Sequence, residues 1–315
     1  MAAKREAGGY GVIAAAAVTV LLWASAFVSI RSAGAHFSPG ALALGRMLTA
    51  SLALGAIWLA RGVGLPPRAA WPGIAATGLL WFGGYMVALN WGERDVDAGT
   101  AAMLVNIGPV LIALLSGWLL REGFPARLLA GVTVSFGGAV VVGLSESHGG
   151  RTSVLGVLLC LAAAASYSVA VVCQKPALRH ASALQVITFA SLIGTLACLP
   201  FAGQLAAQLA RAPLPATLNV LYLGIFPTTL GFTTWAYALA RTAAGTMGAT
   251  TYLVPVLVIA MSWLFLGQVP GLLTLAGGAL CLAGVAVTRR GTFRPGTVSS
   301  STERAVAPPV TDAAP

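Results

Sequence analysis

Arg46 is the one charged side chain that lies well inside an apolar run of this sequence. No Asp, Glu or His occupies such a position, and both lysines, Lys4 and Lys175, stand near the ends of runs. The sequence also contains no HExxH motif and no paired aspartates of the kind that intramembrane proteases use. We therefore expect no catalytic residue, no metal site and no cofactor.

Aromatic residues beside hydroxyl groups recur inside these runs. Trp81 and Tyr85 are four residues apart and share one face of a helix. A ring with a polar tip or neighbour can stack on an amphiphilic solute and still hydrogen-bond it. The other such places are Trp23 with Ser25, Tyr167 with Ser168, Trp235 with Thr234, and Tyr252 with Thr251. We predict a substrate-binding site that contains Trp23, Ser25, Trp81, Tyr85, Asn106, Tyr167, Trp235 and Tyr252.

Asn106 and three prolines complete the set of candidates. Asn106 lies about one turn before Pro109 in a run that is otherwise rich in alanine and glycine, and an amide at that depth must find a partner. Pro109 and Pro255 each free a backbone carbonyl and can kink a helix. We predict that these two prolines, together with Pro227, contribute to a gate or hinge.

The composition indicates which elements must position these residues. Of the 315 residues, 58% are apolar and only 8% are charged, whereas a water-soluble domain carries about 25% charged residues. We therefore expect lipid to be the main solvent of this chain, and a helix needs about 20 apolar residues to cross the bilayer core. The sequence predicts an all-α polytopic membrane protein. Its ten transmembrane helices are expected at about residues 11–30, 40–60, 71–91, 99–119, 128–145, 153–173, 184–203, 217–239, 245–266 and 271–288.

Two residue types have a second interpretation in a membrane. Trp and Tyr also form belts at both membrane interfaces, so the predicted aromatic site residues could be interfacial instead. Arg46 could extend back to the outer head groups, because a central arginine costs roughly 2.5–3.5 kcal/mol on insertion scales. Alternatively, its guanidinium faces an internal cavity or braces neighbouring helices, so a structural charge and a cavity charge both stay open.

Basic residues are unevenly distributed between alternate loops. With the N-terminus inside, thirteen Lys and Arg fall on the cytoplasmic side and four on the opposite side, which follows the positive-inside rule. We expect residues 1–10 and a disordered tail, residues 289–315, to be cytoplasmic in a multi-pass protein of the inner (plasma) membrane. Lys4 and Arg5 before an apolar run imitate a cleavable signal peptide, but that run continues to Ile30.

The second half of the sequence repeats the first at an offset of 146 residues. This register aligns Gly99-Thr100-Ala101 with Gly245-Thr246-Met247, and Pro109-Val110-Leu111 with Pro255-Val256-Leu257. It also aligns, without a gap, Gly131 with Gly277 and Gly138 with Gly284. Chance similarity between helices rich in Ala, Leu and Gly is the alternative explanation.

Each copy contains five helices, in residues 11–145 and 146–288. Because five is odd, the second copy must enter the membrane from the side opposite to the first. We therefore predict two inverted five-helix repeats. Secondary transporters use such pairs to open a central site to each side of the membrane in turn.

This plan resembles the drug/metabolite transporter superfamily, and its EamA-type exporters in particular. The resemblance covers about residues 11–288. In the first copy it is carried by Trp23-Ala24-Ser25-Ala26-Phe27, Arg46-Met47-Leu48, Ala98-Gly99, Pro109 and Arg121-Glu122. In the second copy it is carried by Tyr237-Ala238-Leu239, Ala244-Gly245, Tyr252-Leu253-Val254-Pro255-Val256, Gly277 and Gly284. The chain departs from the family at Gln268, where a Glu is usual.

The resemblance implies an exporter of small amphiphilic metabolites or amino acids that works by alternating access. The alternatives are an uptake permease for a sugar or nutrient on the same fold, and a non-transporting membrane enzyme or sensor. Because no Asp or Glu lies at depth, we expect no buried-acid proton relay. The expected partners are a small-molecule substrate and the lipid bilayer, for a monomer or homodimer. Basic residues scattered singly over many loops predict no nucleic-acid partner.

Overall fold

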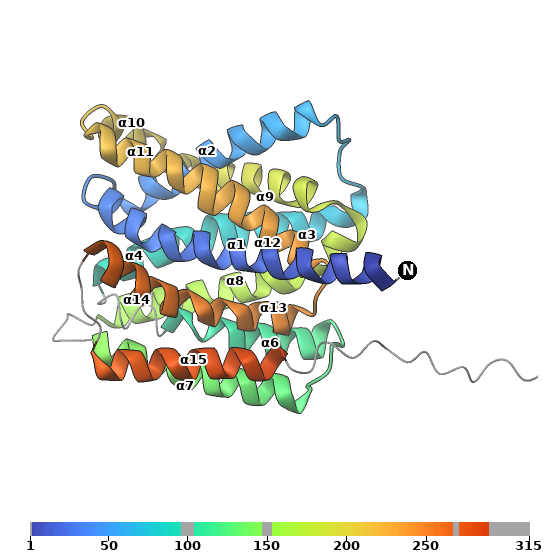
Figure 1. The fold of residues 1–315 in the computed structure, drawn as a ribbon. Coiled ribbons are helices and arrows are strands. Elements are labelled where there is room, and N and C mark those ends of the chain that lie inside the picture. The colour runs from blue at the N-terminus through green and yellow to red at the C-terminus, as the bar shows by residue number, and fades with distance from the viewer. Residues whose placement is uncertain (1, 96–103, 147–152, 267–270, 290–315) are drawn as a thin grey trace, which may run out of the picture.

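The computed structural model of the chain describes residues 2–95, 104–146, 153–266 and 271–289. Every regular element within these ranges is a helix, so the all-α fold expected from the sequence is confirmed. The long helices run side by side as one bundle (Figure 1).

The described residues fall into ten helical stretches, five from each half of the chain. The first half gives α1 (Ala2–Gly34), α2 (Pro39–Ala60), the continuous series η1 (Arg68–Ala70), α3 (Trp71–Ala76), η2 (Thr77–Tyr85) and α4 (Met86–Asp95), then α6 (Gly108–Leu119) and α7 (Ala126–Glu146). The second half begins with α8 (Val154–His180) and the series α9 (Ala183–Cys198), η3 (Leu199–Phe201) and α10 (Ala202–Leu209). It continues with α11 (Leu214–Leu223), η4 (Gly224–Leu230) and α12 (Gly231–Leu239), then α13 (Ala244–Ala249), η5 (Thr250–Tyr252) and α14 (Leu253–Leu266), and ends with α15 (Leu272–Arg289). Of the η segments, η2 and η4 are π-helical and the others are 3-10 helices.

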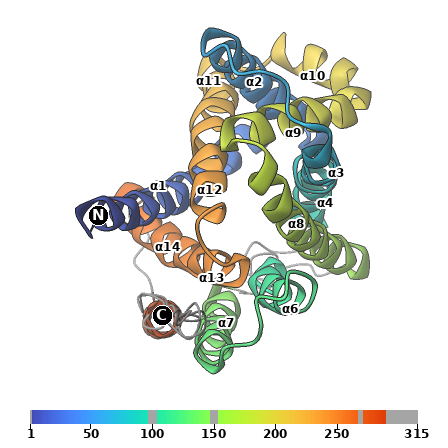
Figure 2. The same ribbon diagram turned by 90° about the vertical axis from the view of Figure 1, so that its right-hand side faces the viewer.

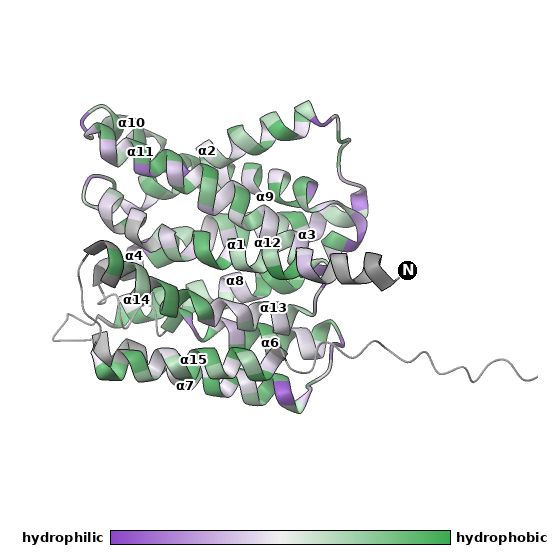
Figure 3. Ribbon diagram, in the orientation of Figure 1, coloured by the Kyte–Doolittle hydropathy of each residue, from purple (hydrophilic) through white to green (hydrophobic). Residues whose placement is uncertain are grey.

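The outside of the bundle is suited to lipid. Among the described residues, four helical stretches are long and apolar enough to span a bilayer, namely Pro39–Ala60, Arg68–Gly92, Val154–His180 and Ala183–Leu209. Shorter apolar helical segments are Tyr10–Ala26, Gly108–Leu119, Ala126–Val141 and Leu275–Thr288. Hydrophobic residues cover the helices along most of their length, and hydrophilic residues gather towards their ends (Figure 3). The protein is a polytopic membrane protein, as the sequence predicts.

Helices α7 and α15 cross at a contact between equivalent residues of the two halves. The Ser135 hydroxyl donates to the backbone carbonyl of Cys281 at 3.1 Å, and the Cys281 thiol donates to the backbone carbonyl of Ser135 at 3.4 Å. The two residues are 146 positions apart, which is the offset of the sequence repeat. A reciprocal contact between equivalent residues indicates a local twofold axis, as in an isologous interface.

Glycines allow the same two helices to approach closely. A Cβ atom at Gly138 would lie 2.6 Å from the Gly277 carbonyl oxygen, and one at Gly131 would lie 2.6 Å from the Gly284 carbonyl oxygen. Gly277 is the equivalent of Gly131, and Gly284 is the equivalent of Gly138, so these contacts also exchange under the twofold operation. Figure 2 shows α7 and α15 side by side at one edge of the bundle. The predicted fold class, with two inverted repeats, is confirmed.

The bundle has two ends, which we name by one residue each. At the Glu122 end, the Glu122 carboxylate in the α6–α7 loop accepts from the backbone at the start of α13. At the Asn90 end, the Asn90 side chain of α4 donates to the backbone at the start of α2. α1 begins at the Glu122 end (Figure 1), and Thr288 of α15 packs on Gly131 near the start of α7. Both ends of the described chain therefore lie at the Glu122 end.

Candidate functional site

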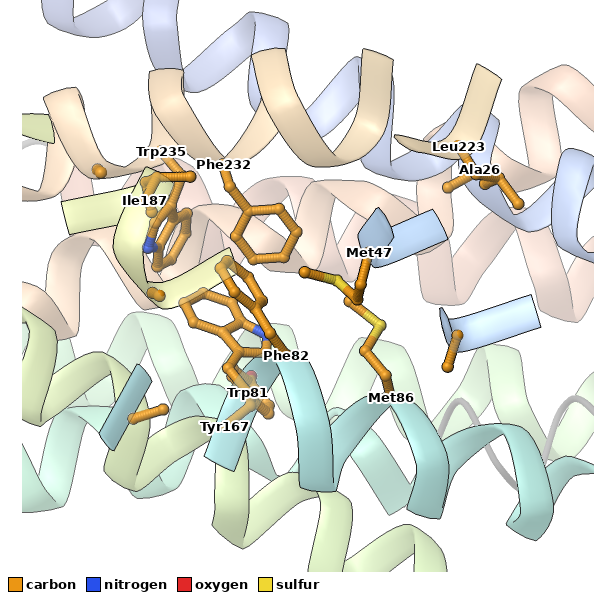
Figure 4. Close-up of a cluster of buried hydrophobic side chains, with 14 of the residues drawn as sticks. Ala26, Met47, Trp81, Phe82, Met86, Tyr167, Ile187, Leu223, Phe232 and Trp235 are labelled. Atoms are coloured by element: carbon orange, nitrogen blue, oxygen red, sulfur yellow. The ribbon is translucent and has the colours of Figure 1, made fainter. Parts of the chain in front are cut away.

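Seven aromatic rings meet in the middle of the bundle, where the two repeats face each other. We call them the aromatic cluster; they are Trp23 of α1, Trp81, Phe82 and Tyr85 of η2, Tyr167 of α8, and Phe232 and Trp235 of α12. Figure 4 shows Trp81, Phe82, Phe232 and Trp235 packed against one another from both repeats.

Ring contacts between the repeats define this cluster. The Phe82 and Phe232 centroids are 4.6 Å apart in an edge-to-face arrangement, and the Trp81 and Phe232 centroids are 4.9 Å apart. Trp23 lies 5.0 Å from Trp235, centroid to centroid. These separations lie in the range where aromatic rings attract each other beyond their burial of surface.

Five predicted site residues belong to the aromatic cluster: Trp23, Trp81, Tyr85, Tyr167 and Trp235. Their position inside the bundle does not fit a belt at the membrane interface. Phe82 and Phe232 were not predicted, because a phenylalanine ring has no polar tip with which to hydrogen-bond a solute. The one available signal for Phe82 was that it directly follows Trp81.

The structure does not place Ser25 among these rings. Its hydroxyl lies 2.7 Å from the Tyr222 hydroxyl of α11 and donates to the Leu22 carbonyl at 2.8 Å. Residues two apart on a helix point in nearly opposite directions, so Ser25 turns away from the rings that Trp23 contacts. This geometry therefore does not favour a direct contact between Ser25 and a substrate bound in the cluster.

Tyr252 and Asn106 contact each other. The Tyr252 side chain is fully buried, and its hydroxyl donates to the Asn106 backbone carbonyl at 3.0 Å. Its ring packs with Ala249, Cys281 and Val132 in a separate apolar group between α7, α15 and η5. Tyr252 and Asn106 thus adjoin the predicted gate prolines, and Tyr252 also lies close to Tyr167 of the aromatic cluster.

Pro109 and Pro255 lie where helices restart. The sequence predicted a helix over 99–119 that Pro109 can kink. Residues 99–103 lie outside the described residues; in the described part Asn106 and Ile107 form a turn, and α6 begins at Gly108. Pro255 is the third residue of α14, directly after the 3-10 turn of η5. A proline has no N–H to donate and fits well in the first turn of a helix, and both Pro109 and Pro255 lie in such a turn.

Pro227 lies inside η4, and a neighbouring threonine compensates for it. Proline has no N–H to offer the Leu223 carbonyl, and the Thr228 hydroxyl donates to this carbonyl instead, at 2.7 Å. The Thr229 hydroxyl donates to the Gly224 carbonyl in the same way, at 3.0 Å. Side-chain hydroxyls of η4 itself therefore donate hydrogen bonds to the backbone carbonyls of this widened π-helical turn.

The two π-helical segments occupy equivalent places in the repeats. Adding the offset of 146 to η2, residues 77–85, gives 223–231, and η4 spans 224–230. Segments of this kind are rare and often mark functional sites. One segment carries Trp81 of the aromatic cluster, and the other leads directly into α12 with Phe232 and Trp235.

Arg46 lies inside the bundle and not at the head-group level. Its side chain is only 7% exposed, its Nε atom donates to the Thr228 hydroxyl at 2.6 Å, and its Nη1 atom faces the Met86 sulfur at 3.8 Å. The interpretation in which the guanidinium reaches the outer head groups is therefore wrong. Arg46 instead joins α2 to η4 of the other repeat, beside the aromatic cluster.

Two hydrogen-bond donors near the cluster are buried without an acceptor among the described residues. They are the indole Nε1 of Trp23 and the amide Nε2 of Gln174. The Gln174 Oε1 atom accepts from Trp235 Nε1 at 3.2 Å. Buried polar groups without a partner are rare and require an explanation.

A polar network closes the Glu122 end of the bundle. The Glu122 carboxylate accepts from the Ala244 N–H at 2.8 and 2.9 Å and from the Gly245 N–H at 3.4 Å. The Lys175 ammonium donates to the backbone carbonyls of Leu239 and Thr242. The α12–α13 loop is thus tied to the α6–α7 loop and to α8. The equivalent contact, between Gln268 and Ala98-Gly99, lies outside the described residues.

An open hollow of about 460 Å³ lies at the Asn90 end, between the α1–α2 loop and α10. Its lining residues are Ala35, His36, Gln204, Ala207, Gln208, Arg211 and Ala212. None of them belongs to the aromatic cluster. We take the cluster as the candidate site, because it is built by both repeats at their interface, whereas the hollow is a surface feature. Within the described residues, no group of three His, Cys, Asp or Glu side chains could hold a metal ion.

Comparison with known proteins gives a consistent result. Residues 10–144 and residues 154–290 each match the EamA-like transporter family. A probable terminal-alkyne amino-acid exporter of Streptantibioticus cattleyicolor is 37% identical over 276 residues, 88% of this chain and 92% of the exporter. A probable amino-acid metabolite efflux pump of Salmonella typhimurium is 25% identical over 288 residues, 86% of this chain and 92% of the pump. A crystal structure of a protein with 24% identity has the same fold, with a TM-score of 0.74 over 90% of this chain and 99% of that chain.

Proposed function

This chain belongs to the EamA-like transporter family, and from that premise we propose that it exports small amphiphilic metabolites or amino acids as a secondary transporter. The Streptantibioticus relative is a probable amino-acid exporter and the Salmonella relative a probable amino-acid metabolite efflux pump, which supports both the direction and the substrate class. The protein acts by alternating access and is not an enzyme. It resides in the inner (plasma) membrane as a monomer or homodimer.

The observation that carries this proposal is the composition of the aromatic cluster. Four rings come from the first repeat and three from the second, so the cluster straddles the interface between two inverted copies. In transporters built from inverted repeats, the substrate binds at that interface near the bilayer midplane. Exchange of the two repeat conformations then opens the site to one side and closes it to the other.

Helix breaks at equivalent places support the same mechanism. Asn106-Ile107 interrupts the helix before α6, and η5 interrupts the helix before α14. Such breaks allow the segments on either side to move as separate rods. We propose that Pro109 and Pro255, together with Pro227 in η4, act as hinges of the two gates.

From the positive-inside rule we infer that the Glu122 end faces the cytoplasm. In this conformation the network of Glu122, Lys175 and the α12–α13 loop ties that end together. We propose that the contact between Glu122 and the start of α13 forms the cytoplasmic gate. For a substrate to enter from the cytoplasm, this contact has to open.

Counterflow in proteoliposomes tests the function directly. Vesicles that contain the purified protein and unlabelled L-phenylalanine, L-leucine or L-norleucine should accumulate the labelled amino acid transiently, and empty vesicles should not. Absence of counterflow for such amphiphilic amino acids would contradict the proposal. In cells, deletion of the gene should increase retention of the solute; decreased accumulation would instead indicate an uptake permease.

A further inference from the structure

We propose that Arg46 binds the carboxylate group of the transported solute. This inference rests on the proposed transport function and extends it, because it names the chemical group that the site recognises. Arg46 binds the polar group of the solute, and the aromatic cluster contacts its apolar part.

The first argument is that Arg46 has no described anionic partner. A guanidinium offers five N–H donors, and the acceptors found for Arg46 are a hydroxyl and a thioether, both neutral. Among the acidic residues, Glu122 is the one whose side chain the structure describes, and its carboxylate is engaged at the start of α13. A buried charge without an opposite charge is costly in a membrane protein. A carboxylate brought by the solute would remove that cost.

The second argument is position. Thr228, which accepts from Arg46 Nε, lies one helical turn before Phe232. Met86, which faces Arg46 Nη1, directly follows Tyr85 on the same helical stretch. Figure 4 shows Met86 and Met47, the neighbour of Arg46, next to the rings of the cluster. A solute whose apolar body contacts the rings would therefore reach the guanidinium with its head group.

The third argument is an excess of donors along one face of η4 and α12. Arg46 contacts this face at Thr228, and Gln174 contacts it at Trp235. Between these two places the Trp23 indole nitrogen lies 3.1 Å from the point where a Cβ atom at Gly231 would stand. Positions 228, 231 and 235 follow the three- and four-residue spacing of one helix face. Trp23 Nε1 and Gln174 Nε2 are both buried without an acceptor in the described chain. Donors without acceptors fit a ligand group that offers only acceptors, and a carboxylate is such a group.

The competing explanation is that Arg46 only braces η4 through Thr228. In that case its replacement would weaken all transport equally, without regard to the head group of the solute. The two explanations therefore differ in one measurable quantity, the preference of the protein for a carboxylate over a neutral isostere.

The first experiment uses the unmodified protein. Unlabelled L-phenylalanine and L-phenylalaninamide are compared as inhibitors of labelled L-phenylalanine counterflow. Loss of one charge-assisted hydrogen-bonded contact should weaken the amide about tenfold or more. Equal inhibition by acid and amide would overturn the role of Arg46 and leave the transport function standing. If no amphiphilic amino acid is moved at all, it is the proposed function that fails.

The second experiment uses two variants of Arg46. In each it measures the acid-to-amide ratio, that is, how much more strongly L-phenylalanine inhibits counterflow than L-phenylalaninamide does. Arg46→Gln should bring the ratio close to one, and Arg46→Lys, which keeps the charge, should retain part of the preference. Thr49→Val is a matched control on α2, because the hydrogen bond described for the Thr49 hydroxyl stays within its own helix, to the Gly45 carbonyl. It should leave the ratio unchanged. If Arg46→Gln lowers counterflow but keeps the acid-to-amide ratio, Arg46 only braces the helices and the inference is wrong. If that variant does not fold, the unmodified protein and Arg46→Lys decide between the two explanations.

Discussion

The hydroxyl of Tyr252 donates to the backbone carbonyl of Asn106, 3.0 Å away, and the two residues are 146 positions apart. They are therefore equivalent residues of the two repeats that contact each other at the two helix breaks. The contact is one-sided, because the first repeat holds an asparagine where the second holds a tyrosine. In this conformation the contact joins the helix break before Pro109 to the helix break before Pro255. It has to change when the repeats exchange conformations.

Tyr252→Phe should destabilise this conformation. The substitution keeps the ring and removes the hydrogen bond to the partly buried Asn106 carbonyl, at a cost of about 1 kcal/mol. We expect a lower melting temperature in detergent and an altered counterflow rate. Tyr222→Phe is the matched control, because Tyr222 pairs with Ser25 and not with the helix breaks at Asn106 and η5. Equal effects of the two substitutions on counterflow would contradict a special role for the Tyr252 contact.

Glu122→Gln should loosen the Glu122 end. The carboxylate accepts from two backbone N–H groups at the start of α13, and a neutral amide oxygen accepts more weakly. The variant copies the residue at the equivalent position, Gln268. We expect faster hydrogen–deuterium exchange, by about tenfold, in peptides that contain Ala244 and Gly245.

A cap at the opposite end controls this measurement. The Ser153 hydroxyl accepts from the Gly156 N–H at the start of α8. Ser153→Ala should raise exchange at α8 and leave the start of α13 unchanged. Unchanged exchange at Ala244 in Glu122→Gln would mean that the carboxylate does not hold this end closed.

The sequence predicted the fold well because its signals were local and repeated. Long apolar runs predict membrane helices wherever they occur, and one constant offset aligned the two prolines, Pro109 and Pro255, as well as the glycines of α7 and α15. The contact between Ser135 and Cys281 joins two residues that are related by that same offset. Five of the seven rings of the aromatic cluster could be selected because each is a Trp or Tyr, whose polar tip distinguishes it from other apolar residues.

The remaining features depend on contacts between distant segments. Phe82 and Phe232 have no polar group, so only their packing identifies them. Ser25 is close to Trp23 in sequence, but helix geometry turns it towards Tyr222. The π-helical segments depend on how Thr228 and its neighbours bond to carbonyls five residues earlier, which no periodicity of the sequence reveals.

Gly138→Ala should destabilise the pairing of α7 with α15. A Cβ at Gly138 would lie 2.6 Å from both the Cys281 nitrogen and the Gly277 carbonyl oxygen, so the helices would have to separate. Overpacking of this kind costs about 1–3 kcal/mol. Gly137→Ala is a control at the adjacent residue, because a Cβ there meets nothing within 4 Å. Alanine is the better helix former, so Gly137→Ala should preserve or raise the melting temperature. Equal melting temperatures of the two variants would contradict close packing at Gly138.

Trp81→Phe should impair transport more than it impairs folding. The Trp81 ring contacts Trp23, Tyr167, Phe232 and Trp235, so it joins both repeats within the aromatic cluster. A smaller ring keeps the core apolar but leaves a gap at the surface on which a solute would stack. We expect counterflow of labelled L-phenylalanine to fall about tenfold, the equivalent of roughly 1.4 kcal/mol of binding.

Trp118→Phe provides the comparison for that measurement. Trp118 is 73% exposed on the outside of α6, where a tryptophan contacts lipid rather than the cluster. The substitution should therefore leave counterflow at the level of the unmodified protein when equal amounts are reconstituted. A stronger loss in Trp118→Phe than in Trp81→Phe would move the substrate site away from the interface of the repeats, because the ring on the lipid face would then matter more than the ring that both repeats share.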